Sequence, residues 1–250
     1  MGLKPNDPGL EPAQQRRPDG SPYVGRAHAP VKRFSKDPEL ERVFRELQRG
    51  FGPQRWWPAE TPFEVLVGAV LTQNTAWRNV ELALANLRSS GLLHPEAIQD
   101  ALDSSLEEAL RPSGYYRAKT RKLRALCDWY LSVGGLRALL ERPLDPLREE
   151  LLLVHGVGPE TADSILCYGA GRRTAVIDAY TRRIFARHGL ADAEAPYEEL
   201  RSFAMERLVR SQAVYEEFHA LCVRAGYEHC KPRPRCEDCP ATTPSGLEGN

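Results

Sequence analysis

Apolar residues recur at helical spacing along most of the chain, and Pro and Gly residues separate the resulting segments. One predicted helix starts at Thr61-Pro62-Phe63-Glu64, which combines a capping box with proline at the first helical position. Short β-like runs such as residues 174–177 are too isolated to form a sheet, so the predicted fold class is all-α. The pattern predicts helices over residues 63–71, 78–89, 117–132, 146–154, 159–168, 179–188, 196–210 and 213–225.

The two ends of the chain lack this pattern. Residues 1–34 contain many Pro and Gly residues and no periodic apolar positions, which predicts a disordered or loosely attached tail. Residues 242–250 form a second, shorter tail. Because no apolar run reaches the length of a membrane span and no signal-type stretch begins the chain, we expect a soluble, cytoplasmic protein.

The charges are sorted along the chain although the formal net charge is zero. Residues 111–124 carry six basic residues and no acidic one, and five arginines lie within residues 171–187. A neutral chain sorted in this way can present a basic face to nucleic acid. The alternative is that both runs are ordinary solvated helix faces.

A short turn between two predicted helices contains Gly156, Val157 and Gly158, and Pro159 starts the second helix. Glycines allow unusual backbone angles and a close approach of another backbone. The free N–H groups at the start of the second helix could bind a phosphate, which would position DNA without reading its sequence. An ordinary helical hairpin would also fit this turn taken alone.

Asp178 follows an apolar run and opens the next predicted helix, about twenty residues after the turn. A carboxylate is favoured there by the N–H donors and the dipole of the helix. Asp178 could therefore be a helix cap, a reactive carboxylate or both.

The turn and the Val-Ile-Asp sequence that ends at Asp178 together resemble the helix-hairpin-helix DNA glycosylase superfamily typified by endonuclease III. The resemblance covers residues 40–240 and implies a base-excision repair enzyme that acts on double-stranded DNA as a monomer, in the nucleoid of a bacterium. It implies a two-lobe fold, with a six-helix barrel-like domain over residues 62–173 and an iron–sulfur cluster domain formed by 35–61 and 174–241. It makes Asp178 the catalytic residue and Gly156, Val157 and Gly158 the phosphate-binding hairpin, together with a monovalent cation.

One position departs from the bifunctional members of that superfamily. Their Schiff-base lysine lies two residues after the last hairpin glycine, where this chain has Glu160. A carboxylate cannot form a Schiff base. We therefore predict a monofunctional glycosylase that uses water, since nothing in the spacing supports Lys119 or Lys122 as a nucleophile.

The segment from Trp56 to Val80 resembles endonuclease III-related proteins that include 3-methyladenine glycosylases. Gln73 and Asn74 are the candidates for the wedge that fills the vacated DNA stack. An alkylated purine is cationic, and an aromatic pocket would attract it through cation–π contacts. The candidate pocket residues are Trp56, Trp57 and Trp77, although core packing is the ordinary role of a tryptophan.

Three cysteines, Cys230, Cys236 and Cys239, lie among prolines near the C-terminus, which is typical of metal ligands. The resemblance implies a 4Fe-4S cluster. Five residues separate Cys230 from Cys236, one fewer than in the superfamily, and no cysteine follows Cys239. Cys222 is the predicted fourth ligand; His229 in that role, with Cys222 as a core thiol, is the alternative, and zinc is the alternative metal.

Three other functions stay open from the sequence. The first is a glycosylase for oxidised pyrimidines or mismatched bases. The second is a bifunctional lyase. The third is a DNA-binding cluster protein with little turnover.

Overall fold

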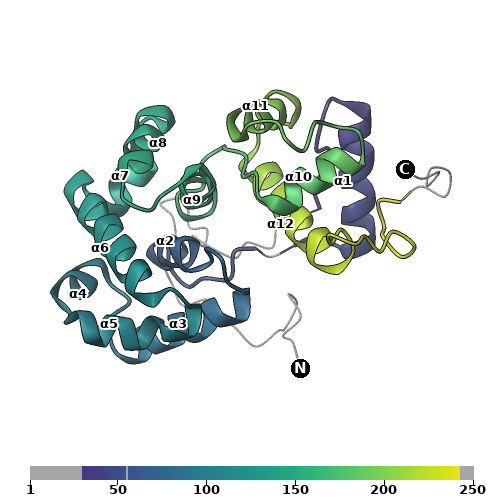
Figure 1. Cartoon of the computed structure of the whole chain (residues 1–250). Helices are drawn as coiled ribbons and strands as arrows, with labels where there is room; N and C mark the ends of the chain where they lie inside the picture. Colours follow the sequence, from purple (N-terminus) through teal and green to yellow (C-terminus); the bar gives the residue numbers. More distant parts are fainter. Residues whose placement is uncertain (1–29, 55, 243–250) are drawn as a thin grey trace. The chain divides into compact units, whose positions relative to one another are not determined.

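The computed structural model describes residues 30–54 and 56–242, and in this part of the chain all regular secondary structure is helical (Figure 1). The predicted all-α class is confirmed. Within the described residues the β-type pairing is a single antiparallel bridge between Ser35 and Leu208. Residues 1–29 of the predicted N-terminal tail and residues 243–250 of the predicted C-terminal tail lie outside the described residues.

The chain divides into two compact units. The described residues of the first unit are 30–58, without residue 55, and 173–242; those of the second are 59–172. The sequence-predicted lobes change at residues 61–62 and 173–174, whereas the units change at 58–59 and 172–173. That one lobe carries a metal cluster stays a prediction.

The second unit is built around one fully buried helix. All ten residues of α2 are buried, and α2 is in contact with α3, α6 and α9. Its start is fixed locally, because the Thr61 hydroxyl accepts a hydrogen bond from the Glu64 N–H at 3.1 Å and Pro62 occupies the first turn. The helices of this unit are α2 (Pro62–Leu71), α3 (Trp77–Ser89), α4 (Pro95–Asp100), α5 (Asp103–Leu110), α6 (Tyr116–Val133), α7 (Gly135–Glu141), α8 (Leu144–Leu153) and α9 (Pro159–Ser164).

Two short helical segments that are not α-helical complete that unit. A 3-10 helix, Arg111–Ser113, precedes α6, and a π-helix, Ile165–Gly169, continues α9. The π-helix packs against α2, where Gly169 leaves room for the Leu66 side chain. The predicted helix over residues 159–168 is therefore present, but its second half is a π-helix.

Aromatic side chains join three helices of the first unit. The Phe218 ring lies 4.6 Å from the Phe44 ring and 5.9 Å from the Phe185 ring, measured between centroids. These three rings come from three different helices, so they join α12 to α1 and α10. The helices of this unit are α1 (Pro38–Phe51), α10 (Ala179–Arg187), α11 (Tyr197–Arg207) and α12 (Gln212–Glu228).

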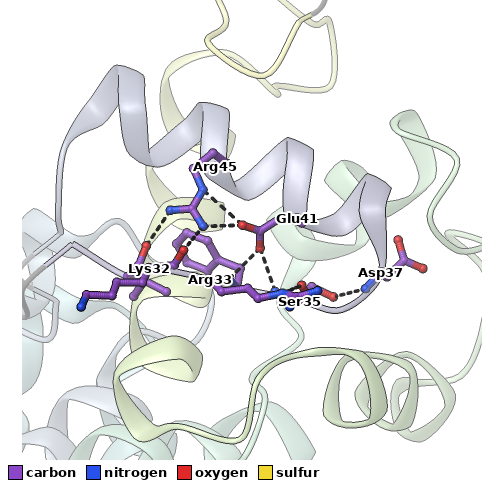
Figure 2. Close-up of polar contacts among 8 residues, drawn as sticks. Lys32, Arg33, Ser35, Asp37, Glu41 and Arg45 are labelled. Carbon is purple, nitrogen blue, oxygen red and sulfur yellow. Dashed lines mark hydrogen bonds and ion pairs between the residues drawn. The ribbon is translucent and has the colours of Figure 1, made fainter.

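Residues 31–34 belong to the folded part of the first unit, so the predicted tail boundary at residue 34 is wrong. Phe34 is fully buried, and its carbonyl accepts a hydrogen bond from the Val209 N–H. The Glu41 carboxylate accepts from the N–H groups of Phe34 and Ser35, and the Arg45 guanidinium donates to the carbonyls of residues 31 and 32 (Figure 2). Two apolar residues, too few to form a periodic pattern, anchor this segment.

Candidate functional site

The predicted hairpin lies between α8 and α9. Gly156 has φ +82°, and a Cβ atom there would lie 2.3 Å from Cγ of Lys122. Gly158 has extended backbone angles that other residues adopt freely, so only Gly156 needs to be glycine. Val157 is buried and anchors the turn, while Gly158 is exposed.

A buried ion pair fixes the two hairpin helices relative to each other. The Arg148 guanidinium on α8 donates to both carboxylate oxygens of Asp163 on α9, at 3.0 and 2.9 Å. The Asp163 side chain has no exposed surface. A bidentate pair of this kind is directional as well as strong. The hairpin therefore presents its turn from a rigid support.

Gln73 ties the end of α2 to this hairpin. Its amide nitrogen donates to the Gly156 carbonyl and to the Thr161 hydroxyl, each at 3.0 Å. Its amide oxygen accepts from the ammonium group of Lys122 at 2.6 Å. The neighbouring Asn74 is exposed and has φ +55°. Of the two wedge candidates, Asn74 is the one that faces solvent.

Lys119 has a structural position. Its ammonium group donates to the carbonyls of Leu71 at 2.8 Å and Ser113 at 2.6 Å, and its side chain is fully buried. Burial, and then the nearby charge of Lys122, lower the pKa of Lys119 to about 8. The ammonium group thus closes the C-terminal end of α2, directly before the segment that holds Gln73.

Asp178 is the N-cap of α10. Its Oδ1 accepts hydrogen bonds from the Thr181 N–H and from the Thr181 hydroxyl, both at 2.7 Å. Its Oδ2 lies 3.7 Å from Nε2 of His219. Burial acts to raise the pKa of Asp178, but the contacts with His219 and then with Thr181 outweigh it, so the pKa stays below its ordinary value. Asp178 is therefore an ionised, buried carboxylate.

The predicted base-pocket tryptophans differ in exposure. Trp57 is 3% exposed, and its ring lies 5.4 Å from that of the half-buried Trp56, with an angle of 49° between the ring planes. Trp77 begins α3 in the other unit and donates from its indole nitrogen to Glu81 at 2.9 Å. The Trp57 ring is thus a core side chain, and Trp56 and Trp77 keep accessible surface.

The predicted metal ligands do not converge in this structure. In the described part of the chain, no three His, Cys, Asp or Glu side chains gather closely enough to hold a metal ion. Cys222 is fully buried beside Thr181; burial and then the charge of Asp178 raise the pKa of its thiol well above the ordinary value. Whether Cys222 is a core thiol or the fourth metal ligand stays a prediction.

The cysteine loop itself is held by α10. The Arg183 guanidinium donates to the Cys230 carbonyl at 2.9 Å, and that of Arg187 donates to Sγ of Cys230 at 3.1 Å and to the Lys231 carbonyl at 2.7 Å. In the described residues, the side chains of Cys222, Cys230, Cys236 and Cys239 do not come close enough together to hold a four-ligand cluster.

Most side chains of the two basic runs have partners inside the protein. Arg124 donates to three backbone carbonyls and to Asp103, and Arg172 donates to the last carbonyls of α7. Arg182 likewise donates to the carbonyls of residues 193 and 195. The runs are thus neither purely solvated faces nor wholly open to a polyanion. Basic residues that the structure leaves exposed include Arg78, Arg121, Arg173, Arg233 and Arg235.

Sequence reasoning missed two features. His219 beside Asp178 had no local signal, because the two residues are 41 positions apart. Tyr115 is 74% exposed with φ +46° at the start of the basic helix α6. The sequence shows that Tyr115 lies between a glycine and a second tyrosine, but it does not show the positive φ or the exposure. Glu160, two residues after the last hairpin glycine, lies exposed in the first turn of α9.

No helix in the described ranges is both long and apolar enough to cross a membrane.

Comparisons with known proteins agree on one family. Residues 67–210 match the sequence profile described as HhH-GPD superfamily base excision DNA repair protein. A Methanocaldococcus jannaschii protein named as a DNA repair glycosylase is 39% identical over 204 residues, which cover 80% of this chain and 93% of the relative. Endonuclease III of Thermotoga maritima is 30% identical over 205 residues, covering 80% and 89%.

A solved structure is similar as well. The crystal structure of H. pylori 3-methyladenine DNA glycosylase bound to 1,N6-ethenoadenine aligns with a TM-score of 0.65 and 27% sequence identity. The alignment covers 75% of this chain and 96% of that one.

Proposed function

Because the chain belongs to the HhH-GPD superfamily of base excision DNA repair proteins, we propose that it is a monofunctional DNA glycosylase for alkylated purines. It would hydrolyse the N-glycosidic bond of a damaged base flipped out of duplex DNA, and leave an abasic site.

The observation that carries the proposal is the state of Asp178. The carboxylate is buried and ionised, and Thr181 occupies one of its oxygens with two hydrogen bonds, which leaves Oδ2 for chemistry. Breaking the glycosidic bond sends the bonding electron pair to the base and builds positive charge on the deoxyribose. A fixed carboxylate of low pKa stabilises that charge without reorganising.

Water then supplies the nucleophile. Its oxygen forms the new bond to the anomeric carbon, oriented by Oδ2 of Asp178, and its proton passes to the carboxylate or to the departed base. The lysines argue against a covalent route. Lys119 is fully buried and donates to two backbone carbonyls, and Lys122 is hydrogen-bonded to the Gln73 side chain. Glu160 occupies the superfamily's lysine position.

DNA would be bound through backbone and base-stack contacts. The hairpin residues Gly156, Val157 and Gly158 would hold a phosphate, and a monovalent cation there stays part of the proposal. Asn74, exposed at the end of α2, is the proposed wedge, while Gln73 supports it from behind. The exposed Tyr115 offers an aromatic face for stacking on a base.

The proposed substrate class, alkylated purines, is based on the positive charge of the damaged base. N3- and N7-alkylated purines are cationic, so they leave easily and are attracted to aromatic faces. Trp56 and Trp77 keep accessible surface for such contacts, and Glu81 adds a negative charge beside the Trp77 indole. The similarity to a 3-methyladenine glycosylase bound to a modified adenine supports this class.

The test is base release. Purified protein would be incubated with methylated duplex DNA, and released bases would be identified by chromatography, with heat-inactivated protein as the blank. Release of 3-methyladenine or 7-methylguanine supports the proposal. Release only from duplexes with an oxidised pyrimidine or a mismatch would assign the chain to the specificity of its endonuclease III relatives instead, and binding of every duplex without release would make it a DNA-binding protein.

The proposed hydrolysis does not use a metal cluster. A 4Fe-4S cluster held by Cys222, Cys230, Cys236 and Cys239 would require their side chains to converge on loading. The test measures iron, zinc and acid-labile sulfide in anaerobically purified protein. Matching iron and sulfide contents support the 4Fe-4S cluster, and bound zinc supports the alternative metal. Protein that contains no iron and no zinc would contradict both metal sites.

A further inference from the structure

Three residues of α12 face α10 along one stripe. His219, Cys222 and Gly226 are spaced by three and four positions, which places them on one side of a helix. Gly226 lies so close to the Tyr180 ring that a Cβ atom would approach within 2.1 Å of Cδ1. Cys222 lies beside Thr181 and His219 beside Asp178, so the stripe meets the first turn of α10.

A histidine in such a stripe needs a polar counterpart. The His219 side chain is 6% exposed, and an imidazole taken out of water is costly unless polar groups compensate it. The Asp178 carboxylate is a charged group that faces it, with 3.7 Å between Nε2 and Oδ2. Leucine or alanine would fill the same helix seam without that cost, so packing alone does not explain the histidine.

The two carboxylate oxygens of Asp178 face residues of two different helices. Both hydrogen bonds from Thr181 end on Oδ1 and come from α10 itself. They fix that oxygen, but Oδ2 is turned toward His219 on α12. A contact of 3.7 Å is longer than a hydrogen bond, and catalytic contacts of this kind commonly shorten when substrate binds.

We propose that His219 is a positioning residue that sets the direction of Oδ2 of Asp178 toward the sugar and the attacking water. The inference rests on the glycosylase function proposed above. His219 acts through Asp178 and does not itself touch the reacting atoms. The close approach of α10 and α12 at Gly226 holds the imidazole at the required place along the helix.

The test compares His219→Leu and His219→Gln with the parent protein. On a duplex with a releasable base, we expect His219→Leu to lower the single-turnover rate by about 100-fold, the scale of a misplaced catalytic group. The affinity for the duplex should change less than about twofold, because DNA contacts are untouched. His219→Gln should recover most of the rate, since its amide nitrogen can donate from nearly the same place.

His188→Gln is the matched control. His188 is the residue after α10, so the substitution changes another histidine of the same unit at the far end of that helix. We expect parent-like rates from it. A His219→Leu protein that folds and keeps the parent rate would overturn the proposal, as would equal losses in His219→Leu and His219→Gln.

A second readout needs no activity. Melting temperatures are measured for Asp178→Asn, His219→Leu and the double variant. If the two side chains interact, the melting temperature of the double variant falls by less than the sum of the decreases in the two single variants. Additive losses overturn the contact. If no protein releases any base but the melting temperatures are non-additive, the proposed function fails while the His219–Asp178 contact stands.

Discussion

The side-chain amide of Gln73 donates a hydrogen bond to the backbone carbonyl of Gly156 and so joins the end of the buried helix α2 to the hairpin turn. The two residues are 83 positions apart in the chain. With Lys122 on its oxygen and Thr161 on its nitrogen, the amide makes three contacts at once. The segment proposed to enter the DNA stack and the turn proposed to bind phosphate therefore form one connected element.

Replacing Gln73 should weaken the fold. Gln73→Ala removes three hydrogen bonds and leaves the Gly156 carbonyl and the Lys122 ammonium without this partner, so we expect a loss of about 1–3 kcal/mol in the free energy of unfolding. Urea unfolding followed by circular dichroism measures it. Asn74→Gly is the control, because glycine tolerates the positive φ of that position; it should keep the stability and lower base release. The opposite pattern would make Gln73 the wedge.

The Arg148–Asp163 pair should be essential to the hairpin. Arg148→Met leaves the fully buried Asp163 carboxylate uncompensated, which costs about 3–5 kcal/mol of unfolding free energy in comparable pairs. Thermal unfolding measures the loss. Arg137→Ala, which breaks an exposed pair with Glu141 on α7, should leave the stability unchanged. Equal effects of the two substitutions would contradict the structural role given to the buried pair.

How far the sequence could predict these features depends on whether their signals are local. The cap at Thr61, the hairpin glycines and Asp178 ahead of α10 are local signals, and they predicted the helices, the all-α class and the helix-hairpin-helix fold, which the structure and its relatives confirm. The helices α1, α4, α5 and α7 were not individually predicted. Three of them have eight residues or fewer, too short for a periodic pattern.

The rest depends on side chains far apart in the sequence. Nothing near Lys119 in the sequence reveals that the carbonyls of Leu71 and Ser113 surround it, so the sequence places Lys119 in a basic run that resembles an open surface. The same holds for Arg124 and Arg172, whose partners are backbone carbonyls of other segments. Charge sorting along a sequence therefore overstates the basic surface when arginines close the ends of helices.

Lys119 should make stability depend on pH. Its pKa is about 8 in the folded protein and near 10.5 when unfolded, so between these values the unfolded chain binds more protons. The free energy of unfolding should therefore rise as pH increases from 8 toward 10.5, relative to Lys119→Met. Urea unfolding of both proteins across this range measures the difference. A difference that stays constant with pH would mean that Lys119 remains charged in the folded protein throughout.

Glu160 should decide between hydrolysis and lyase chemistry. Borohydride reduction during the reaction traps a Schiff base as a stable protein–DNA adduct, and we expect none from the parent protein. Glu160→Lys restores an amine at the superfamily's lysine position, so an adduct should form with that variant alone. An adduct with the parent, lost in Lys122→Met, would instead show that Lys122 is the nucleophile.

The most direct test of the account is base release from methylated duplex DNA by the parent protein and by Asp178→Asn. The substitution keeps the size of the side chain and a cap for α10 but removes the negative charge that stabilises the sugar cation. We predict that the parent releases alkylated purines, while Asp178→Asn binds the same duplex with similar affinity and releases at least 100-fold less, about the effect of losing one electrostatic catalytic group. Equal release by both proteins would contradict the central role of Asp178.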